Sequence, residues 1–551
     1  MRRYFKYLII VVILVLIVLN LSFTQNENRL YDEIIVFDDI NLENLIREEI
    51  NRPYGDIYKS DVLAITTLHA SHCRISGLER DDYYFKYGNN DIISSLEGIQ
   101  HLSNLQELDL SFNQIVDISP LSNLSNLQEL DLRYNQIVDI SPLSTLFNLQ
   151  KLDINYNQIV DITSLSNLTN LQVLYLDGYK IRDISPLSDL TYLQELHLNG
   201  NLINDINPLS NLANLQILNL SSNQFIKDVR PLSNLSSLKE LDLQYNQIED
   251  ISPLSNLTHL VILDLYHNQI KNISSLRNLS LLKELYLNSN QIEDVSPLSN
   301  LANLEKLDLR YNQIKNVSLL CNLNKLKYLY LDKNQIKDTT ALCNLANLNT
   351  LSLCYNQIED ISPLSKSTKL QVLYISSNQI RDINSLSNMS NLIKLYSSYN
   401  QIDDISALSE LYNLQVLTLG SNPISDISII NNLSNLQVLD LSHNHFIQDI
   451  SVLSNLSYLQ ELYIYYNQIE DISALSELDN LQVLYLSNNQ VKDISALKNL
   501  SKLQELDINS NQIQDISALR NLTNLQRLYL HNNQINDYSP LEAFQNTYIS
   551  K

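Results

Sequence analysis

The chain has 551 residues, of which 44% are hydrophobic and 18% charged, and its formal net charge is −24. This length and composition allow a substantial buried core. The seven glycines form no closely spaced pattern of the kind that cradles phosphate, which excludes the common nucleotide-binding motifs. Carboxylates outnumber lysine and arginine, which argues against a nucleic acid partner because phosphate binding needs clustered positive charge.

The N-terminus has the pattern of an export segment. Arg2, Arg3 and Lys6 precede an uninterrupted apolar run over residues 8–19. The run is shorter than the roughly 17–25 residues of a membrane span, which favours a signal peptide, but no small-x-small cleavage site follows it. We therefore expect residues 1–24 to be a signal peptide or an N-terminal membrane anchor. The rest of the chain is then extracytoplasmic, secreted or tethered to the cell surface.

One repeating unit occupies most of the chain. The segment from Leu105 to Asn126 recurs with a period of 22 residues in twenty regular copies. The register shifts by one residue only twice, in NQFIKDV after Asn223 and in NHFIQDI after Asn444. Two degenerate copies, at residues 68–75 and 85–92, precede the regular ones, so we expect about 22 repeats.

Each repeat contains a strand with one buried face. Apolar and polar residues alternate over residues 107–111, so Leu108 and Leu110 point inward. A single repeat cannot bury its aliphatic side chains, and stacking of neighbours therefore forms the core of a quasi-one-dimensional solenoid. Asn113 follows the strand, where its amide can serve backbone groups of the turn. Asp117 or its equivalent occurs in eighteen of twenty repeats, and we expect it to cap a short helical turn.

The repeat pattern L-x-x-L-x-L-x-x-N-x-I-x-D-I-x-P-L resembles the 22-residue class of leucine-rich repeats, and more narrowly the internalin family of bacterial surface proteins. Residues 39–50 are similar to that family's N-terminal helical cap, and residues 93–99 to the start of its first repeat. The resemblance implies an α/β solenoid, a leucine-rich repeat horseshoe with a parallel β-sheet on the concave face and short helical turns on the convex face. It also implies surface display. The sequence shows no wall-sorting sequence and no cell-binding module, so the resemblance supports surface display better than it supports a host receptor.

These patterns divide the chain into four segments. They are residues 1–24 (signal peptide or anchor), 25–62 (linker and helical cap), 63–541 (leucine-rich repeat solenoid) and 542–551 (C-terminal tail).

Two residue types dominate the exposed face of the predicted sheet. The position of Asp109 is aspartate in eight repeats and tyrosine in eight others. Tyrosine combines a large contact area with a polar hydroxyl and is enriched in recognition surfaces, although it is also a good strand residue that duplication would copy. We predict a ligand-binding concave face. Its candidate residues are Tyr374, Tyr396, Tyr399, Tyr463, Tyr466, Tyr485, Asp109, Asp131 and Asp153.

Together these features predict a non-enzymatic, exported scaffold, an adhesion or interaction protein that binds a protein or glycan ligand. We expect a monomer with no catalytic residues, no metal site, no cofactor and no membrane contact beyond the N-terminal segment. The alternative is an intracellular regulatory subunit, since the leucine-rich repeat regulator of protein phosphatase 1 has similar repeats. The N-terminal apolar run and the cap-like segment argue against that alternative.

Polar substitutions and cysteines mark the middle of the repeat array. Thr339, Ser367 and Ser397 replace aliphatic residues at inward positions, which predicts that the stack is weakest over residues 339–397. Cys321 and Cys343 occupy equivalent positions one repeat apart, so they form either a disulfide or two free thiols.

Overall fold

The computed structural model describes residues 32–71, 92–178, 180–544 and 547–551, which belong to two compact units with their boundary between residues 238 and 239. The predicted export segment at residues 1–24 lies outside the described residues, as does most of the degenerate repeat at 85–92. Within the described ranges, no helix is both long and apolar enough to cross a membrane.

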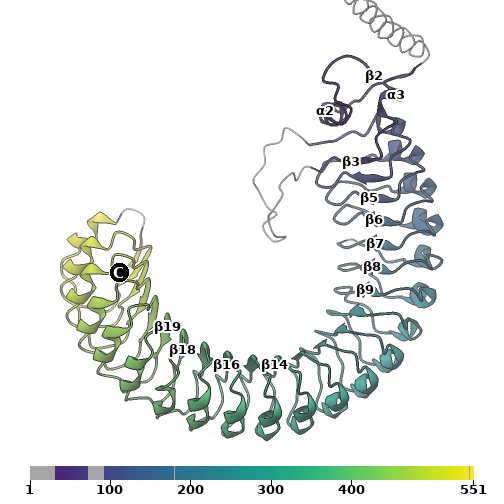
Figure 1. Cartoon of the computed structure of the whole chain (residues 1–551). Helices are drawn as coiled ribbons and strands as arrows, with labels where there is room; N and C mark the ends of the chain where they lie inside the picture. The colour runs from purple at the N-terminus through teal and green to yellow at the C-terminus, as the bar shows by residue number, and fades with distance from the viewer. Residues whose placement is uncertain (1–31, 72–91, 179, 545–546) are drawn as a thin grey trace, which may run out of the picture. The chain divides into compact units, whose positions relative to one another are not determined.

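A small cap precedes the repeats of the first unit (Figure 1). Strand β1 (Ile34–Ile35) pairs antiparallel with β2 (Ile57–Tyr58), and helices α2 (Ile40–Glu49) and α3 (Lys59–Val62) complete the cap. Asp39 caps α2 by accepting a hydrogen bond of 2.9 Å from the backbone N–H of Asn41. Its other carboxylate oxygen accepts one of 2.7 Å from the backbone N–H of Ser94. The predicted N-terminal helical cap is confirmed, and Asp39 links it to the first repeat.

The cap lies against the first repeat at Gly98. Its φ of +103° is in the left-handed region. A Cβ at this position would lie 2.5 Å from Cδ1 of Phe37 and 2.8 Å from the carbonyl oxygen of Val36. Glycine is therefore required here by both the backbone conformation and the close approach.

Each unit contains one strand per repeat, and within each unit successive strands pair in parallel and in register. The first unit contains β3 (Thr67–His69), β4 (Glu107–Asp109), β5 (Glu129–Asp131), β6 (Lys151–Asp153), β7 (Val173–Tyr175), β8 (Glu195–His197) and β9 (Ile217–Asn219). The second unit contains β10 (Glu240–Asp242), β11 (Ile262–Asp264), β12 (Glu284–Tyr286), β13 (Lys306–Asp308), β14 (Tyr328–Tyr330), β15 (Thr350–Ser352), β16 (Val372–Tyr374), β17 (Lys394–Tyr396), β18 (Val416–Thr418), β19 (Val438–Asp440), β20 (Glu461–Tyr463), β21 (Val483–Tyr485), β22 (Glu505–Asp507), β23 (Arg527–Tyr529) and β24 (Tyr548–Ser550).

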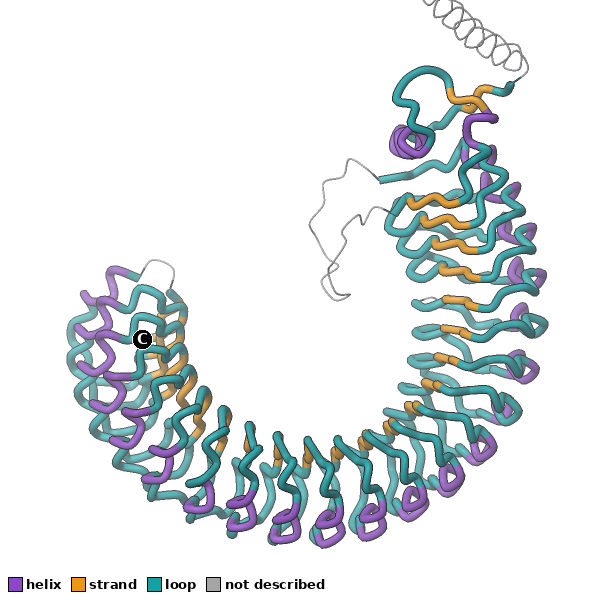
Figure 2. The backbone as a smooth tube through the Cα atoms, viewed as in Figure 1, coloured by secondary structure: helices purple, strands orange, loops and turns teal. Residues whose placement is uncertain are grey.

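Short 3₁₀-helices lie on the opposite side of each repeat, and in the second unit they line the convex side while the strands line the concave side (Figure 2). Those of the first unit are η1 (Ile99–His101), η2 (Ser119–Asn123), η3 (Ser141–Thr145), η4 (Thr163–Asn167), η5 (Ser185–Leu187), η6 (Asn207–Asn211) and η7 (Arg230–Leu232). Those of the second unit are η8 (Ser252–Asn256), η9 (Ser274–Asn278), η10 (Ser296–Asn300), η11 (Ser318–Asn322), η12 (Thr340–Asn344), η13 (Ser362–Lys366), η14 (Asn384–Asn388), η15 (Ser406–Leu408), η16 (Ser428–Asn432), η17 (Ser451–Asn455), η18 (Ser473–Glu477), η19 (Ser495–Asn499), η20 (Ser517–Asn521) and η21 (Ser539–Ala543). The predicted α/β solenoid with a parallel sheet and short helical turns is confirmed. Strand β24 extends its sheet into residues 542–551, which the sequence had assigned to a tail.

The capping aspartates act as predicted. The carboxylate of Asp117 accepts a hydrogen bond of 2.8 Å from the backbone N–H of Ser119 at the start of η2. Asn272 and Asn316, which replace aspartate in two repeats, accept the equivalent bonds at 2.9 and 2.8 Å. An amide oxygen and a carboxylate oxygen serve this turn equally well, which explains why both residue types occur at the position.

The strands are three residues long, shorter than the alternation over residues 107–111 predicted. In the regular repeats, every strand except β7 is followed by an asparagine, Asn113 or its equivalent, and these asparagines together form a ladder along the repeats. The residue just before this position ends the strand, because its left-handed backbone turns the chain. Phe112 has a φ of 59°, and the equivalent residue has a positive φ in all twenty regular repeats. Two repeats place glycine there, Gly178 and Gly200, and eight place phenylalanine or tyrosine despite the strain of that conformation.

Buried asparagines connect neighbouring repeats, as the sequence predicted. Asn113 accepts a hydrogen bond of 2.8 Å from the backbone N–H of Ile93. Its amide nitrogen donates to the carbonyl oxygens of Ala70 at 2.9 Å and Leu110 at 3.0 Å. One side chain thus satisfies buried backbone groups in its own repeat and in neighbouring segments.

The two insertions change the ladder locally. Each adds a second left-handed residue, Gln224 with a φ of 63° and His445 with a φ of 65°. After His445, the next equivalent of Asn113 is Asn467, whose side-chain oxygen is buried and has no hydrogen-bond partner. One repeat later, Asn489 accepts a hydrogen bond of 3.0 Å from the backbone N–H of Ile469. The extra residue therefore removes one hydrogen bond from the ladder.

Of the three polar substitutions in the predicted weak stretch, only Ser367 lacks a hydrogen-bond partner for its side chain. All three polar substitutions are buried, but the hydroxyls of Thr339 and Ser397 each donate a hydrogen bond of 2.9 Å to a backbone carbonyl of the next repeat, at Asp360 and Thr418. The hydroxyl of Ser367 is buried without a partner. The unsatisfied polar group at Ser367 is therefore the destabilising one.

We expect Ser367→Ala to raise the free energy of unfolding by about 1 kcal/mol, because it removes a desolvated hydroxyl that forms no hydrogen bond. The matched variant Ser397→Ala removes a satisfied hydroxyl and should lower the free energy of unfolding by about 1 kcal/mol. Urea denaturation followed by circular dichroism measures both changes. Equal destabilisation by the two variants would show that the Ser367 hydroxyl has a partner in solution.

Candidate functional site

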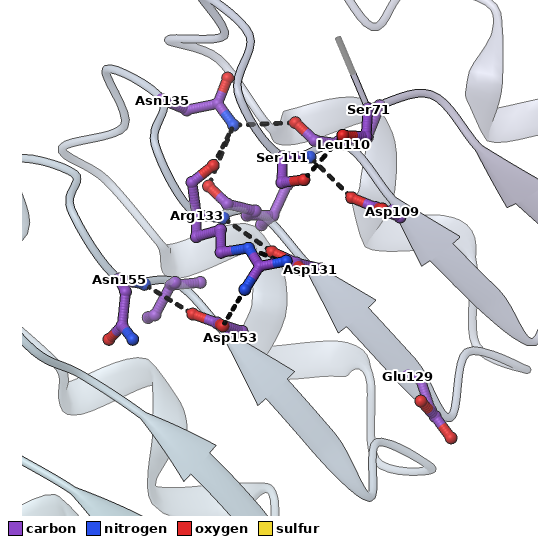
Figure 3. A network of polar contacts seen from close by, with 12 residues as sticks. Ser71, Asp109, Leu110, Ser111, Glu129, Asp131, Arg133, Asn135, Asp153 and Asn155 are labelled. Atoms are coloured by element: carbon purple, nitrogen blue, oxygen red, sulfur yellow. Dashed lines mark hydrogen bonds and ion pairs between the residues drawn. The ribbon is translucent and has the colours of Figure 1, made fainter. Parts of the chain in front are cut away.

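The predicted acidic residues form a connected group in the first unit. Asp109, Asp131 and Asp153 are neighbours in register on β4, β5 and β6. Arg133 lies between two of them, with Nε 3.1 Å from Asp131 and Nη1 3.8 Å from Asp153 (Figure 3). Glu129 lies at the other end of β5 and points away from the group (Figure 3).

Burial changes the protonation of this group. Burial, together with the Asp153 carboxylate, raises the pKa of Asp131 to about 7, although Arg133 and a backbone hydrogen bond act in the opposite direction. Burial also raises the pKa of Asp153. At neutral pH the group therefore carries less negative charge than its sequence suggests.

The aspartates of the concave face also have a structural task that the sequence analysis missed. The carboxylate of Asp109 accepts a hydrogen bond of 2.9 Å from the backbone N–H of Ser111, where the strand ends. All eight aspartates at this position accept the equivalent bond from the residue two positions later. Their recurrence therefore has a reason that needs no ligand. An aspartate three residues before the left-handed residue of each repeat is the signal that would have indicated it.

Among the ring pairs of the described residues, Tyr374 and Tyr396 are the most nearly parallel. They are register partners on β16 and β17, and their rings stack with centroids 4.5 Å apart and planes 7° apart. Burial raises the pKa of both phenols, so both hydroxyls remain protonated at neutral pH. The pair presents two parallel rings and two hydroxyl donors from adjacent repeats.

The hydroxyls distinguish this pair from the second predicted cluster. Tyr463 donates a hydrogen bond of 2.9 Å to the carboxylate of Glu461, and Tyr485 donates to Glu505. Within the described part of the chain, the hydroxyls of Tyr374 and Tyr396 form no hydrogen bond. Only the first pair therefore has both hydroxyls available to a ligand.

The strands of this pair carry mostly small, uncharged side chains, while burial and the negative charge of Asp332 in the preceding repeats raise the pKa of Tyr374. Lys394 is the only charged residue among the strand and strand-end positions of β16, β17 and β18. The positions that follow these strands carry Ser376, Ser398 and Gly420. These small side chains surround the half-buried rings of Tyr374 and Tyr396, whose 22-residue spacing in the sequence already placed them on consecutive repeats.

Two of the predicted tyrosines, Tyr399 and Tyr466, lie three residues after the end of their strands, and they differ in their contacts. Tyr399 is 63% exposed and has a left-handed backbone with a φ of 58°. Tyr466 stacks on His443, with ring centroids 4.3 Å apart and planes 14° apart. Tyr399 lies in the same repeat as Tyr396, three residues after it. One face of the Tyr466 ring, in contrast, is covered by the ring of His443.

Cys321, Cys343 and Cys354 are free thiols, so the disulfide alternative for Cys321 and Cys343 is not formed in this structure. Over the described ranges, no group of three or more histidine, cysteine, aspartate or glutamate side chains has an arrangement that could hold a metal ion.

Comparison with known families and structures defines what the chain resembles. The family model described as Leucine Rich repeats (2 copies) matches through most of the chain, at residues 103–145, 147–189, 193–234, 236–278, 258–300, 280–322, 302–344, 346–388, 368–410, 412–455, 434–477, 458–499, 479–521 and 501–543. A search of curated protein sequences finds no match.

Solved structures share the fold at low identity. A plant peptide hormone receptor, RGFR1 in complex with RGF2, is 22% identical, with a TM-score of 0.64 over 83% of this chain and 87% of that chain. A leucine-rich repeat protein of Leptospira interrogans is 24% identical, with a TM-score of 0.54 over 75% of this chain and 98% of that chain. An internalin, inlF of Listeria monocytogenes, is 28% identical over 86% of this chain and 96% of that chain, but its TM-score of 0.31 carries no argument. The first two likenesses concern the fold alone.

Proposed function

Because the chain belongs to the leucine-rich repeat family, we propose that it is a non-enzymatic scaffold that binds a protein ligand on its concave face, centred on Tyr374 and Tyr396. The observation that carries this proposal is the stacked pair with both hydroxyls unengaged, on strands that carry mostly small, uncharged side chains. Tyrosines of this kind supply contact area and directed hydrogen bonds at low entropic cost. A structural neighbour, the plant peptide hormone receptor, is itself seen in complex with RGF2.

We propose further that the repeats are exported, as an internalin-like surface or secreted protein. The basic residues and the apolar run at residues 1–24 support export, and the cap-like segment before the repeats supports the internalin-like class. Protease added to intact cells that express the native chain should then degrade the repeats. Degradation only after lysis would favour the intracellular regulatory alternative.

The binding site is tested by capture of ligands from the surroundings of the producing cells. We expect Tyr374→Ala/Tyr396→Ala to weaken capture by at least the equivalent of about 2 kcal/mol, because truncation of central aromatic residues removes most of the contact energy. The matched control is Tyr412→Ala/Tyr458→Ala, which removes two exposed tyrosines outside the strands. Equal capture by the wild type and both variants would place the ligand elsewhere, and capture of a glycan alone would replace the protein ligand.

A further inference from the structure

A groove in the second unit carries positive charge in a chain that is strongly acidic. It has a volume of about 650 Å³ and lies where β14, β15 and β16 begin, along the edge of the concave sheet. Its lining residues are Glu305, Lys325, Lys327, Tyr328, Asn347, Asn349, Lys369, Gln371 and Asn391. Three lysines and one carboxylate give it a net charge of +2, against −24 for the whole chain.

Most of the lysine charge in the groove is not neutralised. Lys327 pairs with Glu305 at 2.6 Å. Lys325 and Lys369 instead donate to the side-chain oxygens of Asn303 at 2.7 Å and Asn347 at 2.8 Å. The neutral amides hold these two ammonium groups in place and leave their charge available to an anion.

The lysines recur with a spacing that the repeat determines. Lys325 and Lys369 occupy equivalent positions two repeats apart, which places them about 10 Å apart at the usual strand spacing. Lys283 and Lys327 form a second pair with the same 44-residue separation, at the repeat position two residues after that of Lys325. Glu305 occupies this position in the repeat between them. Lys325 and Lys369, which have amide partners and no carboxylate partner, present two positive charges at this spacing, and this suits an extended ligand with regularly spaced anionic groups.

The other lining residues indicate the chemical class of that ligand. None of the nine lining side chains is aliphatic, so the groove lacks the apolar pockets that anchor peptides. Its asparagine and glutamine amides each offer donors and an acceptor, which match the hydroxyls of a sugar. Tyr328 is 38% exposed and adds an aromatic face. The spacing of Lys325 and Lys369 corresponds to two sugar rings of an extended glycan chain.

We propose that this groove binds an acidic polysaccharide, with Lys325 and Lys369 contacting carboxylate or sulfate groups on successive disaccharides. The site is separate from the pair Tyr374 and Tyr396, since its residues precede the strands on which those tyrosines lie. The net charge of the chain repels polyanions in general, so binding must come from this local cluster.

The experiment measures binding of the full chain to four probes by calorimetry. The probes are heparin oligosaccharides, which carry sulfate and carboxylate, polygalacturonate oligosaccharides, which carry carboxylate alone, neutral dextran and polyglutamate. We expect binding of one or both acidic glycans, weakened by added salt, and no binding of dextran. Comparison of the first two probes distinguishes sulfate from carboxylate recognition.

Variants locate the site. Lys325→Gln/Lys369→Gln should weaken binding of the acidic glycan at least tenfold. The control Lys492→Gln/Lys498→Gln removes the same charge from a groove in which Asp493 and Asp515 balance the lysines, and it should change binding less than twofold.

The proposal is overturned by equal weakening in the two lysine variants, by binding of none of the probes, or by tighter binding of polyglutamate than of either acidic glycan. Tyr374→Ala/Tyr396→Ala serves as a further control and should leave glycan binding unchanged. A loss of glycan binding in that variant would contradict the proposal that the glycan site is separate from Tyr374 and Tyr396, and it would place the glycan on those tyrosines.

Discussion

We expect Asn422→Ala to lower the free energy of unfolding by about 3–5 kcal/mol, because it leaves several buried backbone groups without partners. The side-chain oxygen of Asn422 accepts a hydrogen bond of 3.0 Å from the backbone N–H of Ile402. Its amide nitrogen donates to the carbonyl oxygens of Ser397 at 3.1 Å and Leu419 at 3.0 Å. Asn422 is only 4% exposed, so water cannot replace these bonds without local opening. Urea denaturation followed by circular dichroism measures the loss.

The asparagine at the end of the preceding repeat, Asn413, provides the control. Asn413 is exposed and donates one hydrogen bond of 2.8 Å to the carbonyl oxygen of Ser390. Asn413→Ala should lower the free energy of unfolding by less than about 1 kcal/mol, since water can serve the freed carbonyl. Hydrogen exchange should quicken around Ile402 in the Asn422 variant only. Similar stability of the two variants would show that the ladder contributes little.

The second large effect is a dependence of stability on pH that Asp131 imposes. Its folded pKa of about 7 lies well above the value of about 3.9 in an unfolded chain. Between these values the folded state binds more protons, so the free energy of unfolding falls as the pH rises from about 4 to about 7 and levels off above that. At about 1.4 kcal/mol for each pKa unit, the destabilisation at pH 8 amounts to about 2–4 kcal/mol.

Asp131→Asn should remove this destabilisation. The asparagine oxygen can still accept the hydrogen bond of 3.0 Å from the backbone N–H of Arg133. We expect the variant to be more stable than the wild type by about 2–4 kcal/mol at pH 8 and to differ from it by less than about 1 kcal/mol at pH 4. Urea denaturation at the two pH values measures both differences.

The control for this prediction is Asp117→Asn, which changes an exposed carboxylate on the outer turn. It should alter stability little at either pH, because Asn272 and Asn316 accept the same hydrogen bond in equivalent repeats. A difference between Asp131→Asn and the wild type that is the same at pH 4 and pH 8 would contradict the raised pKa.

The sequence by itself determined the repeating parts of this protein. The 22-residue period, the inward Leu108 and Leu110, the ladder position of Asn113 and the capping position of Asp117 all follow from one repeat, because each is decided by backbone geometry that recurs unchanged. The helix over residues 40–49 could be predicted as well, since Asp39 is a strong N-cap residue and its place before the repeats matches a terminal cap.

Only the tertiary structure decided which repeated residues are free to act. The sequence shows which repeats carry aspartate and which carry tyrosine at the position of Asp109, but not which tyrosine hydroxyls have a partner. The hydroxyl of Tyr485 donates a hydrogen bond to Glu505 of the next repeat. In the repeats after Tyr374 and Tyr396, the position of Glu505 is occupied by Lys394 and Val416 instead. Lys325 and Lys369 likewise form a groove only because stacking places residues 44 positions apart in the sequence within about 10 Å. Such contacts depend on the length and rotamers of side chains on adjacent strands, and the 22-residue period of one repeat position does not specify these.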